Sequence, residues 1–159
     1  MMTGSSVHAN GTDRPTAGGA RGLAALDMLG EAAAPAGLRV DPYVWWRFAT
    51  AGADAMIIGE PASVVRVLNF VWPVLRKPIV QSESRRLNLP VARDGTLVIR
   101  DAHELAGRDQ QRLLEWWDES VAHPRIIATA SRQLSACLEA GAFNRRVFDR
   151  LMDVDLALT

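Results

Sequence analysis

The spacing of hydrophobic positions changes repeatedly along this chain, and the changes predict its elements. From residue 55 onward, short apolar runs alternate with stretches in which apolar positions recur every three or four residues. Short runs are typical of buried strands, and the longer spacing is typical of helices. The expected strands cover residues 55–58, 78–81, 96–99, 125–129 and 154–158, and the expected helices cover residues 63–76, 107–120, 134–140 and 144–151.

The alternation of strands and helices indicates the fold class. Strands separated by helices form crossover units, and both faces of the resulting parallel sheet are covered by helices. We therefore expect an α/β fold for residues 50–159: a three-layer sandwich around a five-stranded, mainly parallel sheet.

The N-terminal third has a different pattern. Residues 1–20 are rich in small and polar residues and show no apolar periodicity, so they bury too little surface to offset their ordering entropy. We predict a flexible tail there. Residues 21–49 are expected to form N-terminal helices, the second opened by Asp41 as N-cap and Pro42 at the first helical position.

Two tryptophan pairs lie on expected helices, Trp45-Trp46 and Trp116-Trp117. Adjacent helical residues point about 100° apart, so both members of a pair cannot face one core. One tryptophan of each pair is thus a candidate for an exposed, partner-facing side chain. Burial under a neighbouring helix is the alternative.

Composition narrows the class of protein. The chain has 159 residues, 48% of them hydrophobic and 23% charged, which is typical of one globular domain. Eighteen basic and eighteen acidic residues balance, so no overall basic field favours direct DNA binding. The single cysteine, Cys137, excludes an internal disulfide, and the scattered histidines have no metal-site spacing. Without a membrane-length apolar run or signal peptide, we expect a cytoplasmic protein.

In open parallel sheets, ligands bind beyond the carboxyl ends of the strands. Polar residues follow three of the expected strands at that edge. The first strand leads into GEPASVVR at residues 59–66, the third into Arg100 and Asp101, and the fourth into Ser131.

Five segments of the chain resemble, in order, the motifs of a known family. They are IIGEPASVVR, DGTLVIRDAHEL, QRLLEWWDE, PRIIATASRQL and GAFNRRVFDRLMDVDLAL. Their order and residue patterns resemble those of the AAA+ ATPase domain of sigma-54-dependent transcription activators, over residues 50–158. The resemblance implies an AAA+ P-loop NTPase fold, ATP and Mg²⁺ as cofactors, and transcription regulation. The family's loop that touches sigma-54 is replaced by residues 82–94, and its helical lid is expected to be missing.

The phosphate-binding loop departs from the family pattern. Such a loop holds phosphates with glycine-permitted backbone amides and one lysine. Gly59 and Glu60 remain, but the resemblance places Val64 at an inner glycine and Val65 at the lysine. β-branched valine resists the backbone geometries that glycine allows.

Two polar residues remain beside these valines, Ser63 and Arg66. Arg66 stands at the magnesium-side position of the motif and can supply part of the missing cationic charge. Lys77, the single lysine, lies eleven residues further on and cannot substitute.

The other family positions are also altered. Arg100 and Asp101 stand where the resemblance places the acidic pair that holds the metal ion and polarises the attacking water. Ser131 replaces the asparagine that senses the terminal phosphate. Asn144 replaces the arginine finger, whereas Arg150 matches the family's second arginine.

Three hypotheses for function follow. The first is a catalytically inactive AAA+-like interaction module without a cofactor or a metal, acting in regulation on an AAA+ ATPase, an activator or a second copy of itself. The second is a weak ATP-binding sensor or ATPase that uses the vestigial positions Gly59, Glu60, Ser63, Arg66, Asp101, Ser131 and Arg150. The third is a decayed gene product without a selected function.

Overall fold

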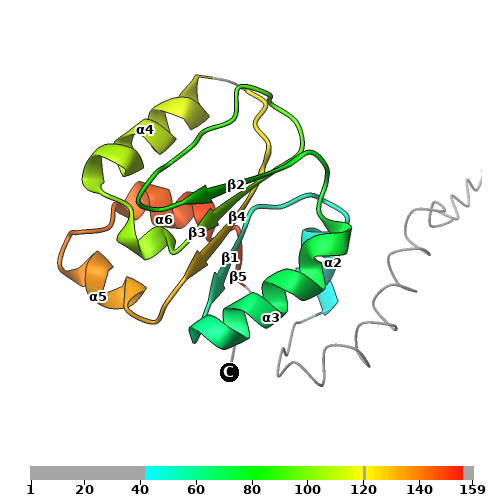
Figure 1. The fold of residues 1–159 in the computed structure, drawn as a ribbon, viewed down its shortest axis with the longest axis horizontal. Coiled ribbons are helices and arrows are strands. Elements are labelled where there is room, and N and C mark those ends of the chain that lie inside the picture. Colours follow the sequence, from blue (N-terminus) through cyan, green and yellow to red (C-terminus); the bar gives the residue numbers. More distant parts are fainter. Residues whose placement is uncertain (1–41, 120, 156–159) are drawn as a thin grey trace, which may run out of the picture.

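The computed structural model describes residues 42–119 and 121–155 (Figure 1). Its helices are α2 (Pro42–Ala49), α3 (Pro61–Val71), α4 (Gly107–Asp118), α5 (Leu134–Glu139) and α6 (Arg145–Leu151), with short 3-10 helices η2 (Trp72–Val74) and η3 (Ala102–Glu104). Its strands are β1 (Ala55–Ile58), β2 (Ile79–Glu83), β3 (Thr96–Arg100), β4 (Arg125–Ala130) and β5 (Val154–Asp155). The predicted tail 1–20, the first of the helices predicted within residues 21–49 and the predicted N-cap Asp41 lie outside the described residues.

The five strands form one sheet in the order β2-β3-β4-β1-β5, and every neighbouring pair is parallel. This confirms the α/β class and the parallel sheet. β1 lies between β4 and β5, so the carboxyl ends of β1 and β4 are adjacent although 72 residues separate the paired Ala55 and Ile127. The topology therefore brings distant segments to one edge of the sheet.

Alternate strand residues contact different helical layers, as the pleat requires. In β4, Ile126 and Ala128 pack in the cluster that also contains residues of α4, α5 and α6. Ile127 packs in the opposite cluster, with residues of α2 and α3. Figure 1 shows α4, α5 and α6 on one side of the sheet and α2 and α3 on the other. The predicted three-layer sandwich is thus confirmed.

Most bounds differ from the prediction by one or two residues, and those of α3 and β2 call for an explanation. The α3 helix starts at Pro61 rather than residue 63 and ends at Val71, where Pro73 converts the chain to the η2 turn. Proline lacks the N–H that an α-helix needs in its interior, so the helix cannot continue through it. β2 extends to Glu83 because it pairs with β3 along its full length.

The tryptophan pairs have different outcomes. Trp46 is 42% exposed and its neighbour Trp45 only 4%, as the helical periodicity predicts. Trp116 and Trp117 are both buried, at 7% and 4% exposure. The connection before β3 covers Trp116, whose indole N–H donates to the Pro90 carbonyl at 3.1 Å. The loop before β3, rather than a neighbouring helix, therefore covers Trp116.

Arg125, the first residue of β4, joins α2 to the sheet. Its side chain is buried, Nε donates to the Ala53 carbonyl at 2.9 Å, and a second nitrogen donates to the Phe48 carbonyl. Burial lowers the pKa of Arg125 to about 10, although the nearby Asp54 carboxylate opposes the shift. The guanidinium also lies 3.9 Å from the centre of the Phe48 ring. One side chain thus binds a carbonyl at the end of α2 and another just before β1.

Candidate functional site

A cleft of about 350 Å³ opens at the carboxyl ends of β1, β3 and β4, where the sequence predicted a site. Gly59 after β1, Asp101 after β3 and Ser131 after β4 all line it. The structure therefore brings three of the predicted residues together, because parallel strands present their carboxyl ends at one edge. Arg100 and His103 line the same cleft.

The turn between β1 and α3 is a regular helix start. Glu60 is the N-cap and Pro61 occupies the first turn. The backbone N–H groups of Ser63 and Val64 both donate to the Glu60 carbonyl, at 2.9 Å. In a phosphate-binding loop, amides at these positions remain free to face the ligand. Here they are used inside the protein, and Pro61 has no N–H to offer.

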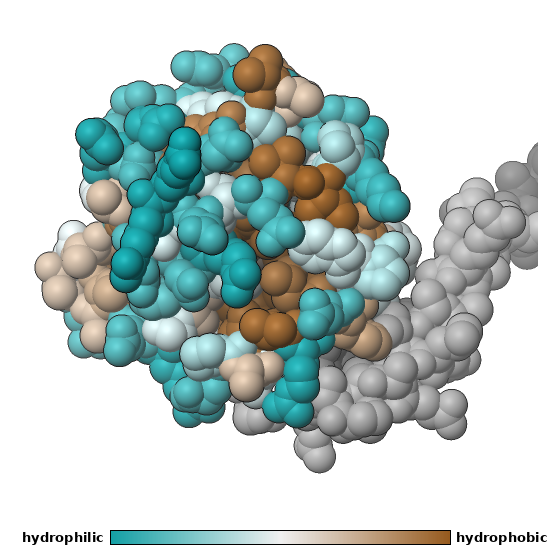
Figure 2. Space-filling view, viewed as in Figure 1, coloured by the Kyte–Doolittle hydropathy of each residue, from teal (hydrophilic) through white to brown (hydrophobic). Residues whose placement is uncertain are grey.

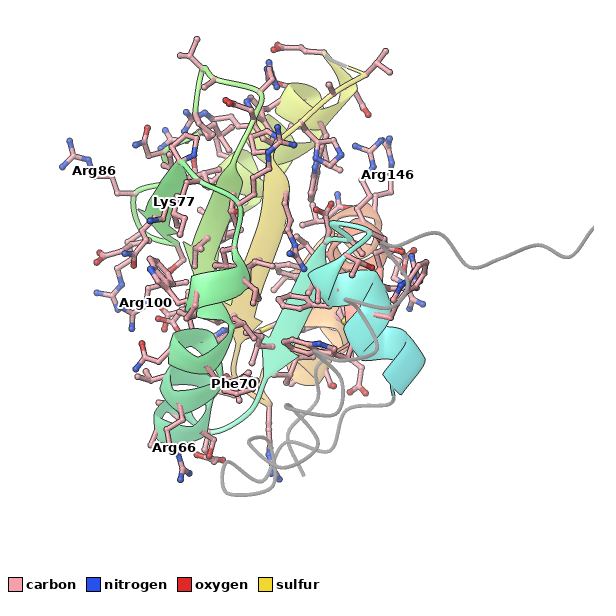
Figure 3. The ribbon with its side chains drawn as sticks, turned by 90° about the vertical axis from the view of Figure 1, so that its right-hand side faces the viewer. Arg66, Phe70, Lys77, Arg86, Arg100 and Arg146 are labelled. Atoms are coloured by element: carbon pink, nitrogen blue, oxygen red, sulfur yellow. The ribbon has the colours of Figure 1, made fainter. Side chains whose placement is uncertain are left out.

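The side chains of this turn do not supply the missing charge. Val65 lines the cleft at the lysine position and is 42% exposed. Arg66 is exposed and is not among the residues that line the cleft. Its guanidinium donates to the Ser63 hydroxyl at 3.3 Å. Figure 3 shows Arg66 extending away from the body of the protein. Glu60 pairs loosely with Arg132, with 4.0 Å between the charged atoms.

After β3, the chain turns sharply at Asp101. This residue adopts a left-handed backbone with φ of 52°, which aspartate tolerates better than most side chains. Its N–H donates to the Thr129 hydroxyl of β4 at 3.0 Å, which holds the turn in place. Arg100 lines the cleft from the position where the resemblance requires a metal-holding acid. A guanidinium there repels a metal ion.

His103 and Ser131 form a contact that the sequence analysis missed. The Ser131 N–H donates to Nδ1 of His103 at 3.3 Å, and Nε2 lies 3.1 Å from the Ser131 hydroxyl oxygen. In the tautomer with its hydrogen on Nε2, His103 accepts the Ser131 N–H at Nδ1 and donates to the Ser131 hydroxyl, so that both ring nitrogens hold this residue beside the cleft. No sequence spacing signals this pair, since only the pairing of β3 with β4 makes the two residues neighbours.

Arg150 lies near the amino ends of the strands, at the end of the sheet opposite the cleft. Its guanidinium donates to Asp118 at 2.8 Å and lies 5.4 Å from the centre of the Trp117 ring. It lines a separate cavity with Asp54 and His123, which precede β1 and β4. The structure thus does not bring Arg150 to the cleft that contains Asp101 and Ser131.

The residues of the cleft do not fit ATP and Mg²⁺, the cofactors that the fold implies. Helix α3 uses the amides that would face the phosphates, Val65 replaces the lysine, and Arg100 faces the metal position. No three His, Cys, Asp or Glu side chains among the described residues are grouped to hold a metal ion. None of the helices described here is long and apolar enough to cross a membrane.

Solved structures with the same fold include three of NtrX from Brucella abortus. The complex with ATP is 13% identical, with a TM-score of 0.54 over 92% of this chain and 36% of that one. The complex with ADP is 16% identical, with a TM-score of 0.54 over 70% of this chain and 33% of that one. A third structure gives 16% identity and a TM-score of 0.52 over 71% of this chain and 34% of that one. This chain spans about a third of the length of those proteins.

No curated protein matches the sequence, but one family model does. The model described as the sigma-54 interaction domain matches residues 71–159, which is more than half of the chain and begins after the altered phosphate loop. This match over more than half of the chain shows that the chain belongs to the sigma-54 interaction domain family.

Proposed function

We propose that this protein is a catalytically inactive member of the family that works by binding another protein, independently of nucleotide. The start of α3 is the observation that carries the proposal. Because the helix already begins at Pro61, the Glu60 carbonyl engages the amides of Ser63 and Val64. A phosphate group would have to break two hydrogen bonds and unwind a turn, and no lysine or arginine of this turn lines the cleft to compensate.

The proposed partner is another AAA+ subunit, either an intact ATPase, a related activator or a second copy of this chain. The AAA+ resemblance supports this, because subunits of that type pack side by side around the nucleotide site. A copy that cannot bind ATP can occupy a place in such a ring without contributing turnover. Its role would then be regulatory.

A nucleotide sensor is the second candidate, and the cleft itself favours it. The cleft has a volume of about 350 Å³ and contains the polar residues Arg100 and Ser131. It lies at the carboxyl ends of the strands, where the family binds its ligand. On this hypothesis, Arg100 rather than Arg66 would contact the phosphates, because only Arg100 lines the cleft.

Calorimetric titration of the folded protein with ATP and Mg²⁺ to millimolar concentration separates the two candidates. We expect no saturable heat. Saturable binding that Arg100→Ala abolishes and Arg66→Ala preserves would contradict the inactive module and support the sensor. A cooperative thermal melt of each sample shows that it is folded.

A further inference from the structure

β2 forms one edge of the sheet, and the hydrogen bonds at its two ends show how its backbone is oriented. The Pro78 carbonyl accepts from the Thr96 N–H at 2.9 Å, and the Ser84 N–H donates to the Arg100 carbonyl at 3.2 Å. In a parallel ladder, the residues whose backbone groups face the neighbouring strand alternate along the chain. The even-numbered residues from 78 to 84 therefore face β3.

The odd-numbered residues direct their backbone groups away from the sheet. For Ile79 and Gln81, none of the residues described in the structure pairs with the N–H or the carbonyl at this edge. At Glu83 the free edge ends, because its carbonyl accepts the Arg86 N–H at 3.0 Å. Four unpaired backbone groups thus form a short edge that an added strand can bind.

Apolar surface accompanies this edge. Ile79 and Val80 are only half-buried, and Val74, just before the strand, is 45% exposed. Figure 2 views the protein from the β2 side and shows hydrophobic surface in the middle of the face, with hydrophilic side chains around it. An extended segment would cover part of this surface.

Charge is concentrated around the same strand. Residues 76–100 carry six basic and two acidic side chains, whereas the whole chain carries eighteen of each. Arg76, Lys77, Arg86 and Arg100 are exposed, and none forms an ion pair with the residues that the structure describes. In Figure 3, Lys77, Arg86 and Arg100 extend from the β2 side of the molecule, and Arg146 lies on the other side.

We propose that the β2 edge binds an extended, acidic segment of a partner protein by strand addition. The proposal rests on the proposed function and names the surface and the chemistry of its partner. Backbone groups of Ile79 and Gln81 would supply the hydrogen bonds, and the four unpaired cations would select acidic side chains.

Other occupants fit the charge less well. Pairing of β2 with β2 of a second copy would bring two sets of unpaired cations together, which is unfavourable in a symmetric interface. Residues 1–41 of this chain carry three arginines and four acidic residues, so they are nearly neutral. An acidic partner segment is the complementary choice.

The test uses the full chain and a fluorescent ten-residue peptide of alternating glutamate and valine. We expect saturable binding by fluorescence anisotropy that weakens at high salt, and no binding of the matching lysine–valine peptide. Gln81→Pro removes an outward N–H without breaking the β3 ladder, so it should weaken binding at least about tenfold while the protein stays folded. Amide exchange should slow at Ile79 and Gln81 when the acidic peptide is bound.

Charge variants complete the design. Lys77→Glu, Arg86→Glu and Arg100→Glu combined should weaken binding at least about tenfold, whereas Arg146→Glu on the other side should change it less than about twofold. The proposal is overturned by absence of peptide binding, by equal binding to the Gln81→Pro protein, or by tighter binding of a ten-nucleotide thymidine strand. It is also overturned if Gln81→Pro dissociates a dimer, because a second copy would then occupy the β2 edge. The same holds if residues 1–41 must be deleted before the peptide binds, because those residues would then occupy it.

These outcomes are independent of the ATP titration. Peptide binding together with ATP binding would refute the inactive module and keep the β2 surface. Absence of both would refute the surface and leave the inactive module standing.

Discussion

At the scale of single residues, Asp54 has the most perturbed carboxyl group among the described residues. Burial raises its pKa to about 6 from 3.8, against the opposing effects of the Ile126 N–H, His123 and Arg125. Its Oδ1 accepts that N–H at 2.7 Å, so the side chain also helps to hold the start of β4. The Asp54 side chain is thus well placed to accept a hydrogen bond, but its burial destabilises the charged form of the carboxyl group.

The pH dependence of stability follows from this shift. Between pH values of about 4 and 6, folded Asp54 binds more protons than unfolded Asp54, so its contribution to the free energy of unfolding falls as pH rises. Asp54→Asn keeps an acceptor oxygen and removes the charge. We expect it to raise the free energy of unfolding at pH 7.5 by about 1–3 kcal/mol and to have little effect at pH 4.

Urea unfolding of both proteins at pH 4, 5, 6 and 7.5 measures this difference. A variant that is less stable than the parent at pH 7.5 would show that the charge of Asp54 is favourable in the fold.

At the scale of elements, two contacts decide how the sheet meets its helices. Arg125 binds carbonyls at the end of α2 and just before β1, which fixes α2 over one face. The Glu60 carbonyl binds the amides at the start of α3, which closes the phosphate loop. Each contact uses backbone groups that another arrangement would leave open to solvent or ligand.

Arg125→Lys tests the first contact. Lysine keeps the charge but cannot donate in the fork geometry that reaches both Ala53 and Phe48, so we expect a loss of about 1–3 kcal/mol in the free energy of unfolding. Chemical denaturation measures the loss. Arg132→Lys, at an exposed arginine that forms only a long ion pair with Glu60, is the matched control and should change stability by less than about 0.5 kcal/mol.

Val65→Lys tests the second contact. It restores the family's lysine on a side chain that already lines the cleft. If the missing charge alone prevents nucleotide binding, this variant should bind ATP. We expect it not to bind ATP at millimolar concentration in calorimetry, because the Ser63 and Val64 amides remain bonded to Glu60. Heat of binding from this variant would show that the turn opens easily.

At the scale of the whole molecule, the helix α2 joins the N-terminal part of the chain to the core. Phe48 is fully buried and Trp45 almost so, in the cluster that also contains Ile57 of β1 and Ile127 of β4. We propose that residues 1–20, by contrast, lie outside the folded unit, because their composition offers no apolar surface to bury.

Two truncations test this division by thermal melting. Deletion of residues 1–20 should change the melting temperature by less than about 2 °C. Deletion of residues 1–49 should abolish the cooperative transition. Loss of one buried Phe or Trp costs about 3–5 kcal/mol, and total stability is only about 5–15 kcal/mol. A cooperative melt from the shorter protein would refute the requirement for α2.

The sequence by itself determined the α/β class, the five strands and the edge at which the cleft lies. These follow from local periodicity and from the rule that parallel strands share one carboxyl edge. Only the tertiary structure decided which residues meet there. The resemblance made Arg150 a nucleotide-binding candidate along with Asp101 and Ser131, and the structure places its side chain against Asp118, beside residues that precede β1 and β4. The His103–Ser131 contact and the free β2 edge also depend on strand order, which pairs residues far apart in the chain and leaves no signal in their spacing.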